Sequence, residues 1–139
     1  MTDHPSVQAF ATGFPVMLVH TGLTLALLVV GSTVYALMTP HKELALIRAG
    51  NSAAAISFGG VLVGLAIPLG VSLAASTTLL EIVMWGAATI LIQLFVFRIT
   101  DALLSGLPAR IAAGEVAAAT LLIAAKLAVA IILACAVAG

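Results

Sequence analysis

The sequence has 139 residues, of which 63% are hydrophobic and 7% are charged. A soluble domain carries about 25% charged residues. A large buried core cannot explain the low share of charged residues here, because the chain is too short to form one. The composition therefore predicts a chain whose solvent is lipid. Five basic and five acidic residues also exclude a nucleic-acid-binding protein, which needs a basic surface.

Four long apolar runs divide the chain, each close to the roughly 20 residues that a helix needs to cross the hydrocarbon core. We expect transmembrane helices over approximately 16–38, 52–74, 78–100 and 108–139. The segment Thr39–Glu43 ends the first run because its proline cannot continue a helix, and Pro108 suits the first turn of the last. A β-barrel would need alternating segments of about ten residues, which these runs lack. The sequence thus predicts an all-α integral membrane protein of one domain, 1–139.

Basic residues lie mainly between spans one and two and between spans three and four, at Lys42, Arg48, Arg98 and Arg110. Because Lys and Arg resist translocation, we expect both of these turns on the cytoplasmic side. Four spans then place both termini outside, an N-out/C-out topology. The first run lacks a basic segment before it and is too long for the core of a signal peptide, so we expect it to be retained.

The two halves of the chain are similar at a shift of 64 residues. The shift aligns Gly22 with Gly86, Ala49-Gly50 with Ala113-Gly114, and the alanine triplet at 53–55 with that at 117–119. We therefore expect two related hairpins, at about 14–74 and 78–139. Each copy holds two spans, so both enter the membrane from the same side, as parallel repeats do.

Short motifs occur throughout the region from Thr39 to Phe97. They read Thr39-Pro40-His41-x-Glu43, Asn51-x-Ala53-Ala54, Phe58-x-Gly60-x-Leu62-x-Gly64, Ile67-Pro68-Leu69 and Trp85-Gly86. This pattern resembles the YjfL-like family of small bacterial inner-membrane proteins, the domain of unknown function 350.

The resemblance implies four helices in a bacterial inner membrane, and it implies no particular activity. Some relatives are encoded near phage-shock-type peripheral proteins, which implies an envelope-stress setting. The family-motif positions in this chain are Pro40, His41, Asn51, Pro68 and Trp85. In the relatives the second repeat also begins with asparagine, whereas Glu115 stands at that position here.

Lys126 is the basic residue that we expect near the middle of the bilayer. A lysine there costs about 2.5–3.5 kcal/mol on insertion scales, so it should face the bundle interior, a wet cavity or a partner. The alternative is that it packs against helix carbonyls or extends toward water. No carboxylate is expected at its depth. The candidate intramembrane polar site comprises Lys126, Glu115, Glu81, Gln93 and His20.

Several polar residues also have a purely structural interpretation. Glu81 follows Thr78 with the spacing of a capping box, and Asn51 and Glu115 precede spans as caps or interface anchors. Arg98 and Asp101 are expected to form a surface pair. Interfacial aromatic anchors are expected at Trp85, Tyr35, Phe95 and Phe97.

The second span carries small residues that permit close helix packing in lipid. These are Gly59, Gly60, Gly64, Ala53 and Ser57. Small residues and a proline could also line an ion path, but close helix packing is the commoner use of such a surface.

Motifs for catalysis are absent from the sequence, and His4, His20 and His41 lack the spacing of metal ligands. We therefore expect no enzyme, no cofactor and no metal, and the single cysteine, Cys135, sets no disulfide. The expected partners are the lipid bilayer, further copies of the chain, and a peripheral or membrane protein.

The leading functional hypothesis is a non-enzymatic inner-membrane protein in envelope homeostasis that forms a homo-oligomer or binds a partner. The alternative is an oligomeric permeation pathway for ions, protons or a small solute, with Lys126 facing the path.

Overall fold

The computed structural model describes residues 4–39 and 42–139, and every regular element in these ranges is a helix. Their order is α1 (Pro5–Met38), α2 (Glu43–Arg48), α3 (Ser52–Ala75), α4 (Leu79–Leu103), α5 (Leu107–Ala112) and α6 (Val116–Ala138). The four long helices are apolar and long enough to cross a membrane. The prediction of an all-α chain with four candidate spans is therefore confirmed.

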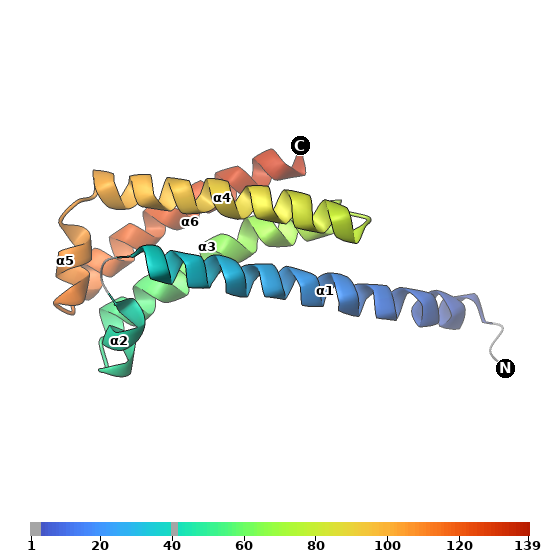
Figure 1. The fold of residues 1–139 in the computed structure, drawn as a ribbon, viewed down its shortest axis with the longest axis horizontal. Helices are drawn as coiled ribbons and strands as arrows, with labels where there is room; N and C mark the ends of the chain where they lie inside the picture. The colour runs from blue at the N-terminus through green and yellow to red at the C-terminus, as the bar shows by residue number, and fades with distance from the viewer. Residues whose placement is uncertain (1–3, 40–41) are drawn as a thin grey trace.

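The four long helices run up and down, as Figure 1 shows. The short helices α2 and α5 lie together at one end, which we call the short-helix end, and the start of α1 and the end of α6 lie toward the other end. The largest helix–helix contact is between α3 and α6; α4 packs against both of these helices, and α1 packs against α3 and α4. Residues of all four long helices therefore meet inside the bundle.

Each short helix is followed by a glycine at which the chain turns into the next long helix. Gly50 has φ 88° and Gly114 has φ 90°, a conformation that favours glycine because it lacks a Cβ. The fourth span consequently begins at Val116, and the expected start near Pro108 was wrong. Pro108 lies instead in the first turn of α5, where its missing N–H is not needed.

The first span is longer than expected, because α1 begins at Pro5 and continues through Pro15. Its 34 residues correspond to a length of about 51 Å at 1.5 Å per residue. The first residue of α4, Leu79, shares a shallow pocket with the α1 segment from Pro15 to His20. Residues 5–14, which we call the α1 extension, therefore project beyond the end of α4 (Figure 1).

Small residues on α3 allow the close contact with its neighbours. Ala53, Ser57, Gly60 and Gly64 are all buried. A Cβ at Gly60 would lie 2.5 Å from the Ile123 side chain of α6, and one at Gly64 would lie 2.8 Å from Cζ of Phe97 on α4. Gly59 was expected on the same surface, but a Cβ there would meet nothing within 4 Å. Gly59 lies on a different face of the helix and takes no part in this packing.

Candidate functional site

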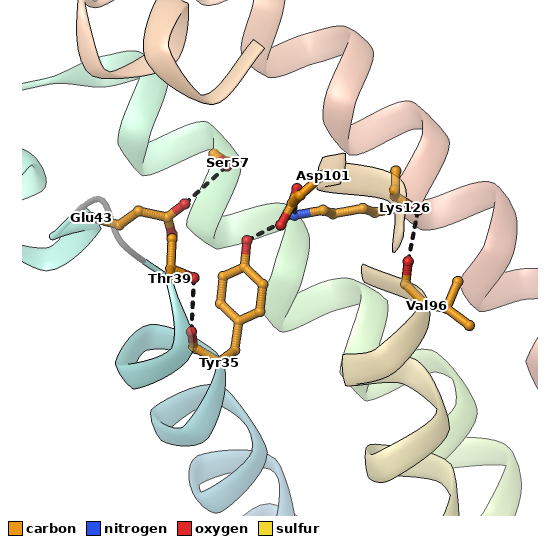
Figure 2. A network of polar contacts seen from close by, with 8 residues as sticks. Tyr35, Thr39, Glu43, Ser57, Val96, Asp101 and Lys126 are labelled. Atoms are coloured by element: carbon orange, nitrogen blue, oxygen red, sulfur yellow. Dashed lines mark hydrogen bonds and ion pairs between the residues drawn. The ribbon is translucent and has the colours of Figure 1, made fainter. Parts of the chain in front are cut away.

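The side chain of Lys126, in the middle of α6, is completely buried. Its Nζ lies 2.8 Å from Oδ1 of Asp101 and donates a hydrogen bond of 2.8 Å to the hydroxyl oxygen of Tyr35. Figure 2 shows the three side chains converging from α6, α4 and α1. An unpaired ammonium in such a place would be strongly destabilising, and the carboxylate and hydroxyl compensate it.

Two aromatic rings close around this ammonium. Tyr35 and Phe97 meet edge to face, with ring centroids 6.2 Å apart and an interplanar angle of 88°. Lys126 Nζ lies 5.4 Å from the Phe97 centroid, within the range of a cation–π contact. Both aromatic residues are buried, so their expected role as interfacial anchors was wrong.

Asp101 is the partner of Lys126, which corrects two expectations. We expected Asp101 to pair with Arg98 at the surface and no carboxylate to lie at the depth of Lys126, whereas the side chain of Asp101 is 12% exposed and forms an ion pair with Lys126. Depth was misjudged because α6 begins at Val116 and not near Pro108, and because α4 continues past the expected end of its span to Leu103. Lys126 therefore lies closer to the short-helix end than expected. The chain makes α5 beyond the end of α4 before α6 starts (Figure 1), and the long lysine side chain spans the remaining distance.

Glu43, the first residue of α2, is a second buried carboxyl beside this cluster. It is 8% exposed, and Ser57 on α3 donates a hydrogen bond of 3.4 Å to its Oε1. Its Oε2 has no hydrogen-bond partner among the described residues. Burial raises the pKa of the Glu43 carboxyl to about 7, against the lowering effect of Lys126, with Asp101 raising it further. Near neutral pH this group can therefore gain or lose a proton.

A pocket of about 320 Å³ lies next to the cluster at the short-helix end. Residues of α5 close one side of the pocket, and its polar lining comes from Tyr35, Thr39, Glu43, Arg98, Asp101 and Ser105. Lys126 does not line the pocket. The arrangement presents two carboxyl groups to an accessible space while the ammonium stays behind them. It can exchange a proton or hold a polar group there, and no group of three metal-ligating side chains accompanies it in the described part of the chain.

Gln93 is the second predicted polar residue that lies inside the bundle. It is fully buried, and its Nε2 donates a hydrogen bond of 3.4 Å to the carbonyl oxygen of Gly64. His20 lies near the far end of the bundle, where α1 passes Leu79.

The carboxylates of Glu81 and Glu115 lie outside the cluster. Glu81 forms the predicted capping box with Thr78 at the start of α4. Glu115 is the N-cap residue of α6 without capping by its side chain, and it pairs with Arg110 of α5. This contact lowers the pKa of the Glu115 carboxyl. The five predicted polar residues therefore do not form one site.

Asn51, a family-motif position, connects the two halves of the chain. Its Oδ1 accepts a hydrogen bond of 3.0 Å from the backbone N–H of Ala54 and so caps α3. Its Nδ2 donates to the carbonyl oxygens of Ile111 and Ala112, at 3.2 and 3.1 Å. A single side chain thus satisfies backbone groups at the start of α3 and at the end of α5.

The other family-motif positions have separate surroundings. Pro68 is buried within α3, and Trp85 is 57% exposed on α4. Pro40 and His41 lie outside the described residues.

Sequence reasoning missed Tyr35, Asp101 and Glu43 as members of the cluster, although a signal was present. A lysine inside a membrane needs a carboxylate partner. Once Glu81 and Glu115 are assigned to helix starts, the remaining acidic residues are Asp3, in the N-terminal segment expected outside, and Glu43 and Asp101, both at the short-helix end. Elimination would have named the correct pair of candidates.

Comparison with known proteins gives one family. The family model described as Domain of Unknown Function (DUF350) matches residues 9–137. The chain is 35% identical over 72 residues to the UPF0719 inner membrane protein YjfL of Escherichia coli strain K12 and to that of Escherichia coli O157:H7. Each match covers 52% of this chain and 54% of the relative, so it spans about half the length of these relatives. No solved structure matches the chain.

Proposed function

Because the chain belongs to the family of the Domain of Unknown Function DUF350, we propose that it is a non-enzymatic membrane component that assembles with itself or with a partner protein in envelope homeostasis. The relatives it matches are named inner membrane proteins, and the chain has four helices able to span a membrane. It is accordingly a multi-pass protein of the bacterial inner membrane.

The main support for the assembly proposal is the exposed apolar surface of the α1 extension. It exposes Val7, Phe10 and Phe14, and the rings of Phe10 and Phe14 stack with centroids 5.1 Å apart. A helix of about 51 Å exceeds a hydrocarbon core of about 30 Å, so part of this apolar surface reaches the headgroup region or beyond. Exposed apolar surface outside the hydrocarbon is typical of a protein interaction site.

Cysteine crosslinking in native membranes tests the assembly. In a Cys135→Ala background, Phe10→Cys is compared with Leu91→Cys. Leu91 is also highly exposed, but it lies in the middle of α4 and not on the α1 extension. We expect oxidation to yield a dimer or a heavier adduct with Phe10→Cys only. A monomer in this assay, together with a monomeric mass in mild detergent, would contradict the proposal.

The proposed topology is N-out/C-out with two parallel hairpins. The grouping of Lys42, Arg48, Arg98 and Arg110 at or near the short-helix end supports that end as cytoplasmic. The helix boundaries support the hairpins, since α5 and α6 each begin 64 residues after α2 and α3. In the Cys135→Ala background, an impermeant maleimide should label Gly139→Cys and not Arg110→Cys in intact spheroplasts. The reverse pattern would overturn the orientation.

Permeation through an oligomer is the second candidate. The pocket lined by Glu43 and Asp101 favours it, because a polar opening at the end of a bundle is how an ion path begins. The complete burial of Lys126 does not support a path that this residue faces. Proteoliposomes should show proton or ion flux that falls in Asp101→Asn and persists in Glu115→Gln. Absence of flux in the unaltered protein would contradict this candidate.

A further inference from the structure

A second hollow, which we call the basic groove, lies between α1, α2 and α3. Its volume is about 560 Å³, and its walls are mainly apolar, with Leu28 and Leu37 from α1 and Phe58 and Leu62 from α3. Lys42 and Arg48 line it where α2 closes the short-helix end. The groove therefore has mainly apolar walls and two basic side chains at one end.

The groove is open on the outer surface of the helix bundle. The side chains of Leu37 and Val29 on its wall are 80% and 65% exposed, and both Lys42 and Arg48 are exposed. An acyl chain of the membrane can therefore enter it from the side, without any opening of the helices.

Several positions that line the groove are related by the 64-residue shift to positions in or beside the pocket next to Lys126. The two hollows nevertheless differ in chemistry. Leu37 and Leu62 in the groove correspond to Asp101 and Lys126 in the polar cluster. Lys42 and Arg48 correspond to Gly106 and Ala112, which line the pocket without any charge. The pocket thus has buried charges beside it, and the groove has an apolar wall with two exposed cations at its end.

We propose that the basic groove binds an anionic phospholipid, with an acyl chain against Leu28, Phe58 and Leu62 and the phosphate between Lys42 and Arg48. The two cations are six residues apart, about 9 Å along a helix, so their long side chains can reach one phosphate from both sides. Basic residues at the membrane face attract anionic headgroups, and the apolar wall selects a lipid over a soluble anion.

Glu43 also lines the groove, but we expect its carboxyl group to repel the phosphate only weakly. Its side chain is buried and bonded by Ser57, while Lys42 and Arg48 extend outward. Lipid binding in the basic groove involves one face of a single chain and does not depend on the proposed assembly.

Native mass spectrometry in mild detergent tests the proposal, with delipidated protein and two lipids of identical acyl chains. We expect phosphatidylglycerol to be retained more tightly than phosphatidylcholine, and Arg48→Gln to weaken phosphatidylglycerol about fivefold. Arg110→Gln is the matched control, since Arg110 lies on the other short helix and outside the groove. Equal retention of both lipids, or equal losses in Arg48→Gln and Arg110→Gln, would overturn the proposal.

Two further experiments distinguish binding of a phospholipid from binding of a free anion. Inorganic phosphate at the same concentration should not displace phosphatidylglycerol, and displacement would mean that the groove recognises phosphate alone. Thr33→Phe fills the groove from an exposed position on α1, where the native hydroxyl donates a hydrogen bond to the carbonyl oxygen of Val29 in the same helix. This variant should keep its circular dichroism spectrum and lose retention of both lipids. Unchanged retention in a folded Thr33→Phe protein would count against an acyl chain in the groove.

Discussion

The ammonium of Lys126 and the carboxylate of Asp101 form an ion pair of 2.8 Å that joins α6 to α4 inside the bundle. The two partners are not equally enclosed, because the side chain of Lys126 is 0% exposed and that of Asp101 is 12% exposed at the pocket. Loss of Asp101 would strand a charge with no access to water, whereas loss of Lys126 would leave a carboxylate that water can reach. The pair therefore predicts unequal effects of its two single substitutions.

Asp101→Asn should lower the free energy of unfolding by about 3–5 kcal/mol, because it leaves a buried ammonium without its counter-charge. Lys126→Met should cost less, since the remaining carboxylate lies beside the pocket. The double variant Lys126→Met/Asp101→Asn should recover much of the loss. Reversible unfolding in mixed detergent micelles measures all three. Simply additive losses in the double variant would show that the two charges are not coupled.

The close contact between α3 and α6 predicts different responses at two adjacent glycines. Gly60→Ala places a Cβ 2.5 Å from the Ile123 side chain and should destabilise the bundle by about 1–3 kcal/mol. Gly59→Ala is the control, because its Cβ meets nothing and alanine favours the helix. Gly60→Ala should be partly rescued by Ile123→Ala, as followed by thermal unfolding in detergent. Equal stability of Gly59→Ala and Gly60→Ala would contradict this packing.

The four long helices could be predicted from the sequence because lipid imposes a simple requirement of length and apolarity. The boundaries of α3 and α4 lie within three residues of the prediction. The start of α6 was misplaced because α5 is apolar apart from Arg110, and the break between the two helices is only three residues long, with Gly114 at a positive φ. Composition does not reveal such a break.

The polar cluster was harder to predict because it depends on how the helices are offset along the bundle. Lys126 was recognised as exceptional from its sequence position alone. Its partners were not, since Tyr35 at a helix end is typical of an interfacial anchor and Asp101 lies two residues from the end of α4. Helix offsets and crossings are set by packing contacts such as that of Gly64 with Phe97, which hydropathy does not encode.

Asn51 should contribute to stability through both halves of its amide. Asn51→Asp keeps an oxygen that can cap α3 but loses the donor to Ile111 and Ala112, whereas Asn51→Ala loses both functions. We expect a loss of about 1 kcal/mol or more for aspartate and a larger loss for alanine. Unfolding in detergent gives the order. An aspartate variant as stable as the unaltered protein would show that the contact with α5 contributes nothing.

The raised pKa of Glu43 predicts that stability falls as the pH rises. The carboxyl has a pKa of about 7 in the folded chain against 4.5 in the unfolded chain, chiefly because it is buried. Between these values the folded state holds more protons, so the free energy of unfolding decreases with increasing pH. The contribution is complete below about pH 4.5 and is lost as the pH passes through about 7.

Glu43→Gln should therefore flatten the dependence of stability on pH between about 5 and 8, because glutamine has no proton to lose. Asp101 and Lys126 remain in that variant, so the difference from the unaltered protein isolates Glu43. Glu115→Gln is the control, since the contact with Arg110 holds the pKa of Glu115 below its usual value and confines its effect to acid pH. Thermal unfolding across this range makes the comparison. If Glu43→Gln kept the slope of the unaltered protein, the buried Glu43 carboxyl would not be its source.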